Sequence, residues 1–219
     1  RLNTNAVLNL NANTNTVVLH YTKDSKQKDN TVTSENKVTN TYTFDLNDIL
    51  LGEKGVITKV DSSTETPLAG AEFTLYTDEN CTTKYENSVF KGVVVSNDSG
   101  KLVTINNESM KGFAAGTYYL KETKAPANYS LNAKVYQVVI TANNYNDNGQ
   151  LNEWTVTIDG TLVATNGSTA DAGVQIPNTQ LSNLPSTGGM GTYLFTIVGV
   201  VLMTCAAGAF FVSRRKTNK

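Results

Sequence analysis

Three polar side chains stand where the alternating pattern of the predicted strands calls for apolar residues: Lys59, Glu122 and Asn178. Because successive side chains of a strand point to opposite faces, Glu122 shares a face with Leu120, and Asn178 shares one with Ile176. Apolar residues on both sides of Lys59 leave its direction open. Burial would lower the pKa of the amine and raise that of the carboxyl, giving a neutral nucleophile beside a proton donor. The alternative is that Lys59 and Glu122 are solvated and Asn178 merely ends a strand.

A second set of residues that could take part in a reaction lies near the C-terminus. An uncharged apolar run over 193–212 is long enough to cross about 30 Å of hydrocarbon as a helix, and it shows no polar face. The basic tail at 213–219 predicts a cytoplasmic C-terminus, with everything before the span outside. The linker 181–192 contains a short motif, whose residues are Leu184, Pro185, Ser186, Thr187 and Gly188. Taken alone, this motif could be a plain Pro/Gly linker.

In this order and spacing, the motif, the span and the basic tail resemble the cell-wall sorting signal that sortases read on Gram-positive surface proteins. The resemblance implies that a sortase cysteine attacks the Thr187 carbonyl and cleaves the bond to Gly188. Thr187 would then be joined to a peptidoglycan precursor or to a lysine of a neighbouring pilin subunit. We therefore expect a secreted protein that is held in the membrane transiently and then anchored to the cell wall of a Gram-positive bacterium.

The composition argues against several other classes of function. A net charge of -1 without a basic patch outside the tail argues against nucleic acid as a partner. His20 is the only histidine and has no cysteine or acidic cluster near it, so neither a metal nor a cofactor is expected. Cys81 is the only cysteine outside the span, so a disulfide cannot staple the exterior part. An enzyme is the weakest interpretation, because no catalytic set appears beyond three residues that could react with one another.

The exterior part of the chain predicts an all-β fold. Short runs rich in Thr, Val and Tyr alternate with turn signals such as Asn146–Gly149. About seven short strands over residues 55–180 indicate an immunoglobulin-like β-sandwich. Residues 1–48 hold only two strand-like runs, and we predict that they are the last strands of an upstream β-sandwich domain, joined by a linker at Leu46–Gly55. Because the chain starts at Arg1 without a signal peptide, we expect a longer precursor.

Three runs within the predicted sandwich alternate most clearly, and each places its apolar residues on one face. We expect these three faces to contribute to the core. Their members are Ala71, Phe73 and Leu75; Tyr136, Val138 and Ile140; and Trp154, Val156 and Ile158.

Two stretches of the predicted sandwich resemble motifs of a known domain family. They are Thr58-Lys59-Val60-Asp61 followed by 67–73, and Tyr118-x-Leu120-x-Glu122-Thr123-x-Ala125-Pro126-x-x-Tyr129. They resemble the opening and the E-box of the collagen-adhesin B-type (Cna-B-like) domains of Gram-positive pilins. The resemblance implies an intramolecular isopeptide bond between Lys59 and Asn178, formed with the assistance of Glu122. Asn128 stands where that family commonly has glycine, and asparagine also tolerates a left-handed backbone.

The N-terminal part resembles the end of the isopeptide-forming domain that precedes a terminal B-type domain in SpaA-type backbone pilins. Asn15, Asn36 and Asn40 are possible acceptors there, with the partner lysine upstream. Together these features predict a structural pilus, or fimbrial, subunit anchored through an LPXTG signal. The alternative is a wall-anchored adhesin in which this domain is a stalk and an upstream region binds collagen or another host ligand.

Overall fold

The computed structural model describes residues 5–21, 33–181 and 190–217. The chain divides into two compact units, Arg1–Gln180 and Leu181–Lys219, and each is described by itself. The described part of the first unit consists mainly of β-strands, and that of the second is mainly one helix. The predicted all-β fold with a C-terminal apolar helix is therefore confirmed.

The largest sheet has eight antiparallel strands in the order β13-β12-β11-β10-β9-β5-β6-β7. It places β9 at its centre, between β10 and β5. Its strands are β5 (Glu72–Tyr76), β6 (Val93–Ser96), β7 (Leu102–Thr104), β9 (Gly116–Lys124), β10 (Val135–Tyr145), β11 (Leu151–Ile158), β12 (Thr161–Thr165) and β13 (Ser168–Thr169).

Three strand pairs and a short helix complete the first unit. β4 and β14 pair in parallel, whereas β3 pairs with β8, and β1 with β2, in the antiparallel direction. These elements are β1 (Asn13–Tyr21), β2 (Thr33–Thr41), β3 (Phe44–Asp45), α1 (Asn47–Leu50), β4 (Ile57–Asp61), β8 (Lys111–Phe113) and β14 (Val174–Asn178).

The core follows the alternation of the sequence. All nine residues of the three predicted apolar faces are buried, including Trp154, which is 1% exposed, and Val138, which is fully buried. Side chains of one strand face point the same way, so a strand with one apolar face packs that face inward and leaves the other to solvent. The prediction of these three core faces is confirmed.

The core of the sandwich begins before residue 55. The ring of Phe44 in β3 lies 4.8 Å from that of Trp154, measured between centroids, and Leu46 is fully buried. The structure thus differs from the predicted boundary at 55 and from the predicted linker Leu46–Gly55, because residues 44–50 contribute to the core. A four-residue helix is too short to show a helical period, so the pattern alone could not identify it.

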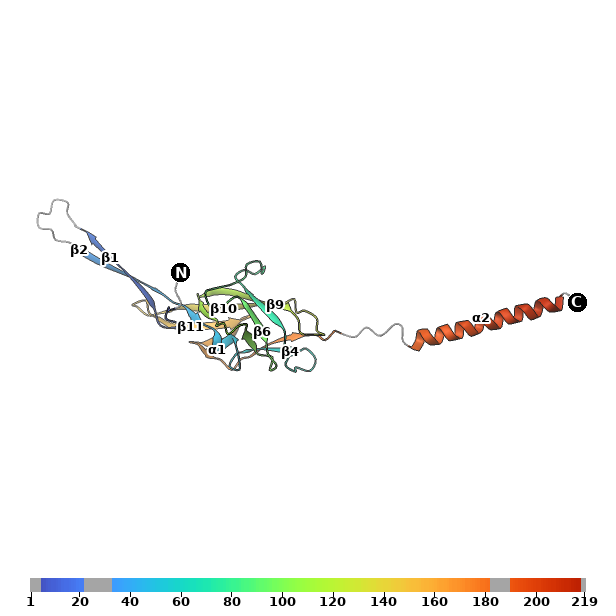
Figure 1. The fold of residues 1–219 in the computed structure, drawn as a ribbon. Helices are drawn as coiled ribbons and strands as arrows, with labels where there is room; N and C mark the ends of the chain where they lie inside the picture. The colour runs from blue at the N-terminus through green and yellow to red at the C-terminus, as the bar shows by residue number, and fades with distance from the viewer. Residues whose placement is uncertain (1–4, 22–32, 182–189, 218–219) are drawn as a thin grey trace. The chain divides into compact units, whose positions relative to one another are not determined.

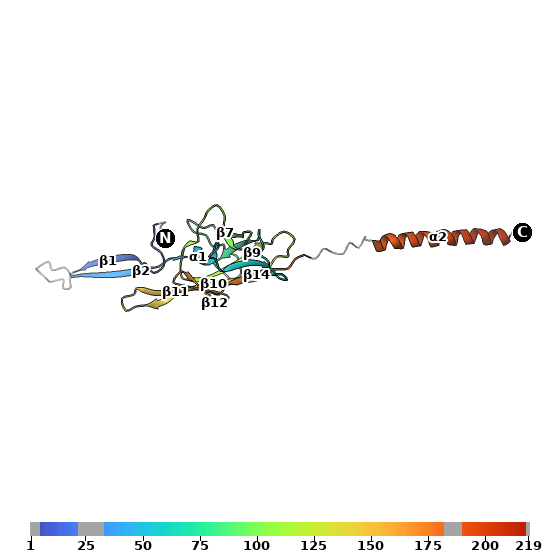
Figure 2. The ribbon, with the colours of Figure 1, turned by 90° about the horizontal axis from the view of Figure 1, so that it is seen from below.

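β1 and β2 form a hairpin that extends from the sandwich (Figures 1 and 2). They pair from Asn13 opposite Thr41 to Tyr21 opposite Thr33. Their side chains are mostly exposed, and Leu19 is 57% accessible although it is apolar. Two paired strands bury too little surface to make a core of their own. That this hairpin ends an upstream domain stays a prediction.

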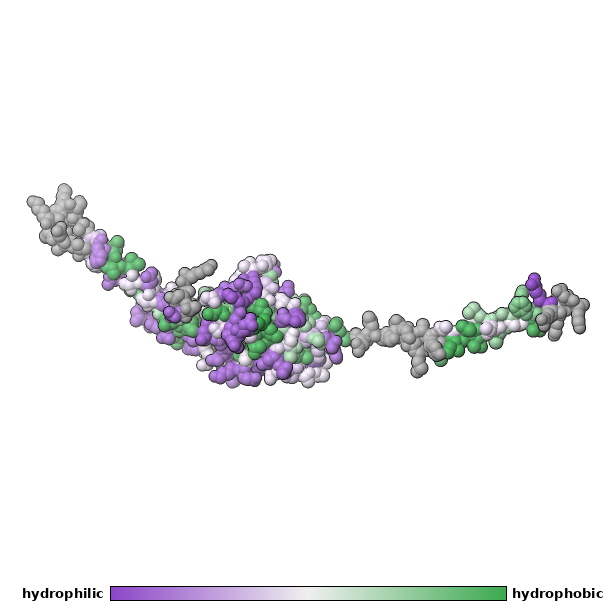
Figure 3. Space-filling view, in the orientation of Figure 1, coloured by the Kyte–Doolittle hydropathy of each residue, from purple (hydrophilic) through white to green (hydrophobic). Residues whose placement is uncertain are grey.

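The helix of the second unit is α2 (Met190–Thr217), which contains a candidate membrane span at Leu194–Arg214. No part of this span is buried within the protein. Hydrophobic side chains cover the described part of the helix, and strongly hydrophilic ones appear only near its C-terminal end (Figure 3). The hydroxyl of Thr204 donates to the carbonyl oxygens of Val200 and Val201, so this polar group is satisfied within the helix.

Candidate functional site

The candidate site lies where the first and last strands of the sandwich meet. β4 and β14 run parallel, with Ile176 opposite Lys59 and Asn178 opposite Asp61. Parallel neighbours need a long connection, so this pairing brings together residues that are far apart in the sequence. Glu122 comes from β9 at the centre of the large sheet, where it is paired with Phe73 of β5.

Lys59, Glu122 and Asn178 are all buried. Their relative exposures are 0%, 1% and 2%, respectively. The alternative in which Lys59 and Glu122 are solvated therefore does not hold. Because burial of polar groups is costly unless they are paired, the contacts among them determine what the site can do.

Hydrogen bonds link Asn178 to Glu122 and Lys59 to the backbone of the last strand. Nδ2 of Asn178 donates to Oε1 of Glu122 at 2.9 Å. Nζ of Lys59 donates to the carbonyl oxygen of Ile176 at 2.8 Å and to that of Val60 at 3.4 Å. The amine is thus bound to β14 two residues before Asn178.

The surroundings move both titratable groups toward their neutral forms. Burial lowers the pKa of Lys59 from 10.5 to about 8, although the charges of Glu122 and Asp61 oppose the shift. Burial raises the pKa of Glu122, against the opposing effects of hydrogen bonds from Asn132 and Asn178 and of the Lys59 charge. Both shifts therefore increase the fractions of neutral amine and of protonated carboxyl relative to the same groups in water.

Oδ1 of Asn178 is buried and has no hydrogen-bond partner. A half-turn of the amide about its Cβ–Cγ bond exchanges Oδ1 and Nδ2 and places the oxygen opposite Glu122. A protonated Glu122 then donates to that oxygen and polarises the carbonyl, whereas an ionised Glu122 accepts from Nδ2. The two amide orientations correspond to the two protonation states of Glu122.

Asn132 is a residue of this site that periodicity did not indicate, since it lies in the loop between β9 and β10. Its backbone N–H donates to Oε2 of Glu122 at 2.6 Å. Its side-chain Nδ2 donates to the carbonyl oxygen of Pro177 at 3.0 Å and to the hydroxyl of Tyr136 at 3.2 Å. This one residue therefore contacts three strands that build the site.

Asp61 and Tyr129 hold the end of β4 beside the site. The Tyr129 hydroxyl donates to Oδ2 of Asp61 at 2.9 Å, and Oδ1 accepts the backbone N–H groups of Ser63 and Thr64. These hydrogen bonds keep the pKa of Asp61 below its usual value. Nearby, Asn128 adopts φ +69°, the left-handed backbone expected for the residue that replaces glycine.

Gly100 allows a close approach of the backbone to β4. Its carbonyl oxygen accepts the N–H of Lys59 at 2.7 Å, and its φ is +71°. A Cβ added to Gly100 would lie 2.4 Å from the carbonyl oxygen of Lys59, so a larger residue would displace the strand that carries the lysine.

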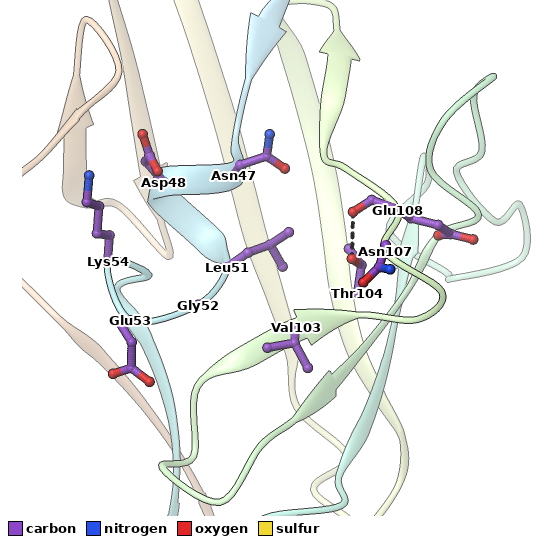
Figure 4. Close-up of a pocket in the computed structure, with 10 residues that line it drawn as sticks. All are labelled: Asn47, Asp48, Leu51, Gly52, Glu53, Lys54, Val103, Thr104, Asn107 and Glu108. Carbon is purple, nitrogen blue, oxygen red and sulfur yellow. Dashed lines mark hydrogen bonds between the residues drawn. The ribbon is translucent and has the colours of Figure 1, made fainter.

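A pocket beside α1 is separate from these residues (Figure 4). Its polar groups serve the fold, because Oδ1 of Asn47 accepts the N–H of Met110 and the Thr104 hydroxyl donates to the carbonyl oxygen of Glu108. Among the described residues, no cluster of His, Cys, Asp or Glu could hold a metal ion. The motif from Leu184 to Gly188 lies outside the described residues.

The structure thus combines an all-β first unit with an apolar helix that is long enough to span a membrane. Two family matches specify it further. Residues 53–155 match the SpaA family, described as a prealbumin-like fold domain, and residues 176–219 match the LPXTG cell wall anchor motif. The chain thus carries a SpaA prealbumin-like domain and a cell wall anchor, and it is a cell-wall-anchored surface protein. Lys59 and Glu122 fall in the first match, and Asn178 falls in the second.

The chain is also homologous to the trypsin-resistant surface T6 protein of Streptococcus pyogenes serotype M6. The two are 29% identical over 86% of this chain and 40% of that protein. The structure of the T6 backbone pilin is 22% identical, with a TM-score of 0.41 over 83% of this chain and 46% of that one. The 35 kDa C-terminal fragment of the major pilin GBS80 of Streptococcus agalactiae is 22% identical, with a TM-score of 0.42 over 78% of this chain and 55% of the fragment. The chain therefore spans less than half the length of the curated relative it matches.

Proposed function

We propose that this chain is a structural pilus subunit, anchored and assembled by a sortase, whose sandwich is closed by an isopeptide bond between Lys59 and Asn178. The observation that carries the proposal is the burial of an amine, a carboxyl and a carboxamide together on β4, β9 and β14. These are the groups that an amide exchange needs, in a chain that ends in a cell wall anchor. The homology to a protein whose structure is described as a backbone pilin supports the proposed function of a structural pilus subunit.

The internal bond forms by amide exchange. Neutral Nζ of Lys59 attacks Cγ of Asn178, which forms a C–N bond and a tetrahedral oxyanion. One proton passes from the attacking nitrogen to Nδ2, the Cγ–Nδ2 bond breaks, and ammonia leaves. Folding places the reacting groups together, so the step needs no cofactor.

Glu122 acts at two stages of this exchange. Protonated, it donates to Oδ1 of Asn178 and makes Cγ more electrophilic. It then delivers that proton to the leaving nitrogen and takes the proton of the attacking amine, which restores the neutral carboxyl. Its present contact with Nδ2 of Asn178 supports this role, because the leaving nitrogen already lies at hydrogen-bond distance.

The external bond forms at the sorting motif. A sortase cysteine attacks the Thr187 carbonyl, releases the part from Gly188 onward and leaves a thioester, which an amine of a neighbouring subunit or of a peptidoglycan precursor resolves. Asn178 lies six residues before Leu184, so force that enters through Thr187 reaches the internal bond after a short segment. That bond would carry the load in place of the hydrogen bonds between β4 and β14.

Intact mass tests the internal bond directly. The folded protein should be lighter than its sequence by roughly 17 Da, the mass of one ammonia, and Glu122→Ala should restore the full mass. Lys37→Ala is a matched control, because this lysine also lies in a strand but is exposed. An unshifted mass in the wild-type protein would contradict the proposal.

A wall-anchored adhesin is the second candidate, with this sandwich as a stalk and a host ligand bound elsewhere. The single anchor and the β-sandwich fit both functions. A ladder of covalent multimers on a denaturing gel, lost in Thr187→Ala, would favour the pilus subunit. A single wall-linked band would favour the adhesin.

A further inference from the structure

The loop between β9 and β10 places one hydrogen-bond donor against Oε2 of Glu122, the oxygen that does not face Asn178. The carboxyl has two oxygens, and they have different partners: Oε1 contacts Nδ2 of Asn178, and Oε2 accepts the backbone N–H of Asn132. A backbone N–H only donates, so the oxygen that receives it must act as an acceptor. When the amide of Asn178 is turned so that Oδ1 faces Glu122, the proton of a neutral Glu122 is therefore directed to Oε1, the oxygen that faces Asn178.

The side chain of Asn132 fixes the loop that presents this N–H. Oδ1 accepts the backbone N–H of Lys134 at 2.9 Å, which closes a local turn. Nδ2 donates to the carbonyl oxygen of Pro177, the residue immediately before Asn178. The same side chain thus holds both the donor to Glu122 and the strand that carries the acceptor of the cross-link.

We propose that Asn132 is a positioning residue for the Lys59–Asn178 exchange: it directs the proton of Glu122 to Oε1 and keeps β14 in register with that oxygen. The inference rests on the proposed function, since it assigns a role within that reaction. Asn132 acts through Glu122 and Pro177 rather than on the reacting atoms of Lys59 and Asn178.

Two substitutions separate the contacts of Asn132. Asn132→Ala removes the local turn and both side-chain donors. Asn132→Asp keeps an oxygen that accepts from Lys134 but places a carboxylate against the Pro177 carbonyl, where it cannot donate. Leu131→Ala is the matched control, because this neighbour in the same loop is 51% exposed.

The experiment follows bond formation in the full chain. The protein is made by cell-free synthesis in detergent micelles, translation is stopped, and the loss of ammonia is followed by intact mass across a pH series. Both Asn132 variants should form the bond about 10-fold more slowly, the factor that corresponds to the loss of one hydrogen bond between neutral groups. Leu131→Ala should match the wild-type rate.

The pH profile distinguishes positioning from mere stabilisation. The Asn132 N–H favours the ionised form of Glu122, so weakening it should raise the pH at which the rate falls as Glu122 loses its proton. Lys59 and Tyr136 are the other titratable groups that interact with Glu122. Lys59 is unchanged in both variants, whereas Tyr136 loses the hydrogen bond from Nδ2 of Asn132. Because Asn132→Asp also adds a carboxylate, the pH profile of Asn132→Ala is the decisive one. The same substitutions in a Lys59→Ala background, which cannot form the bond, report the structural cost alone through the melting temperature.

The outcomes separate the two proposals. Slow formation with a displaced pH profile supports the positioning role. Wild-type rates in both Asn132 variants, or slow formation with an unmoved profile, would overturn it while the cross-link itself stands. A wild-type mass without ammonia loss would overturn the cross-link and this inference together.

Discussion

The pair β4–β14 and the hairpin β1–β2 are both two-stranded, yet they differ in how far their side chains are buried. The hairpin is the longer, with nine residues in each strand, and its side chains remain mostly exposed. β4 and β14 have five residues each, and most of the β4 side chains are buried against the sandwich. The length of a hydrogen-bonded ladder therefore does not decide whether a polar side chain is forced into the core. Packing against a third element does.

One lysine on each strand pair illustrates this difference in burial. Lys37 on the hairpin is exposed, whereas Lys59 on β4 is fully buried. The sequence around Lys59 is more apolar than that around Lys37, but apolar residues on both sides of Lys59 leave its direction open. Burial alone makes Lys59 a candidate nucleophile, because it favours the neutral amine. The comparison predicts which changes should have large effects and which should have none.

The largest effect is expected from removing the cross-link. Lys59→Ala should abolish the ammonia loss, and it should lower stability because the bond would close a loop of about 120 residues. By the chain-entropy relation for disulfides, such a loop contributes about 5 kcal/mol. Chemical unfolding and intact mass check both parts. Lys37→Ala should change neither, and an equal loss of stability in that variant would break the comparison.

A smaller but still large effect is expected where the N-terminal segment joins the core. Phe44→Ala should cost about 3 to 5 kcal/mol, because a buried ring that packs on Trp154 is lost. Urea unfolding measures this cost. If the variant is as stable as the wild type, residues before 55 are not part of the cooperative unit and the predicted boundary at 55 would be restored.

The pH dependence of a protein without the cross-link distinguishes the buried lysine from the exposed one. In Asn178→Ala the amine of Lys59 stays free, and its pKa of about 8 in the folded state lies below the value of 10.5 for an unperturbed lysine. The unfolded state then binds more protons between these values, so stability should rise as the pH increases from about 8 to 10.5. The gain should be about 1.4 kcal/mol for each pKa unit that separates the two states.

Melting temperatures across this range check the pH effect. The double variant Asn178→Ala with Lys59→Met removes the titrating amine and should lose the rise. A rise of the same size in the double variant would assign the effect to another group and would leave Lys59 indistinguishable from an exposed lysine.

The smallest effect is expected on the hairpin. Val17→Ala should change stability by less than about 0.5 kcal/mol, because this side chain is already 56% exposed. The measurement is the same urea unfolding that serves Phe44→Ala. A loss of several kcal/mol would mean that the hairpin packs against a partner in solution.

Much of this fold could be predicted from local pattern. The apolar faces that contain Phe73, Val138 and Trp154 were indicated by alternation, and the helix was indicated by an uncharged run of sufficient length. The core residues at 44–50 could not be predicted, because a two-residue strand and a four-residue helix are too short to show a period. Asn132 was missed for a similar reason, since a loop residue has no alternating neighbours to contrast with.

Local sequence pattern is enough to predict the class of the fold, the faces of its strands and the anchor at its end, because these depend on neighbours within a few residues. Three features follow from tertiary packing alone: β4 pairs with β14, Lys59 rather than Lys37 is buried, and Glu122 contacts Asn178 and Asn132. The alternation of side chains along a strand shows which face each side chain occupies, but it does not show which strand lies opposite. The chemistry of the site depends on that second choice, because the partners of Lys59 and Glu122 come from elements far apart along the chain.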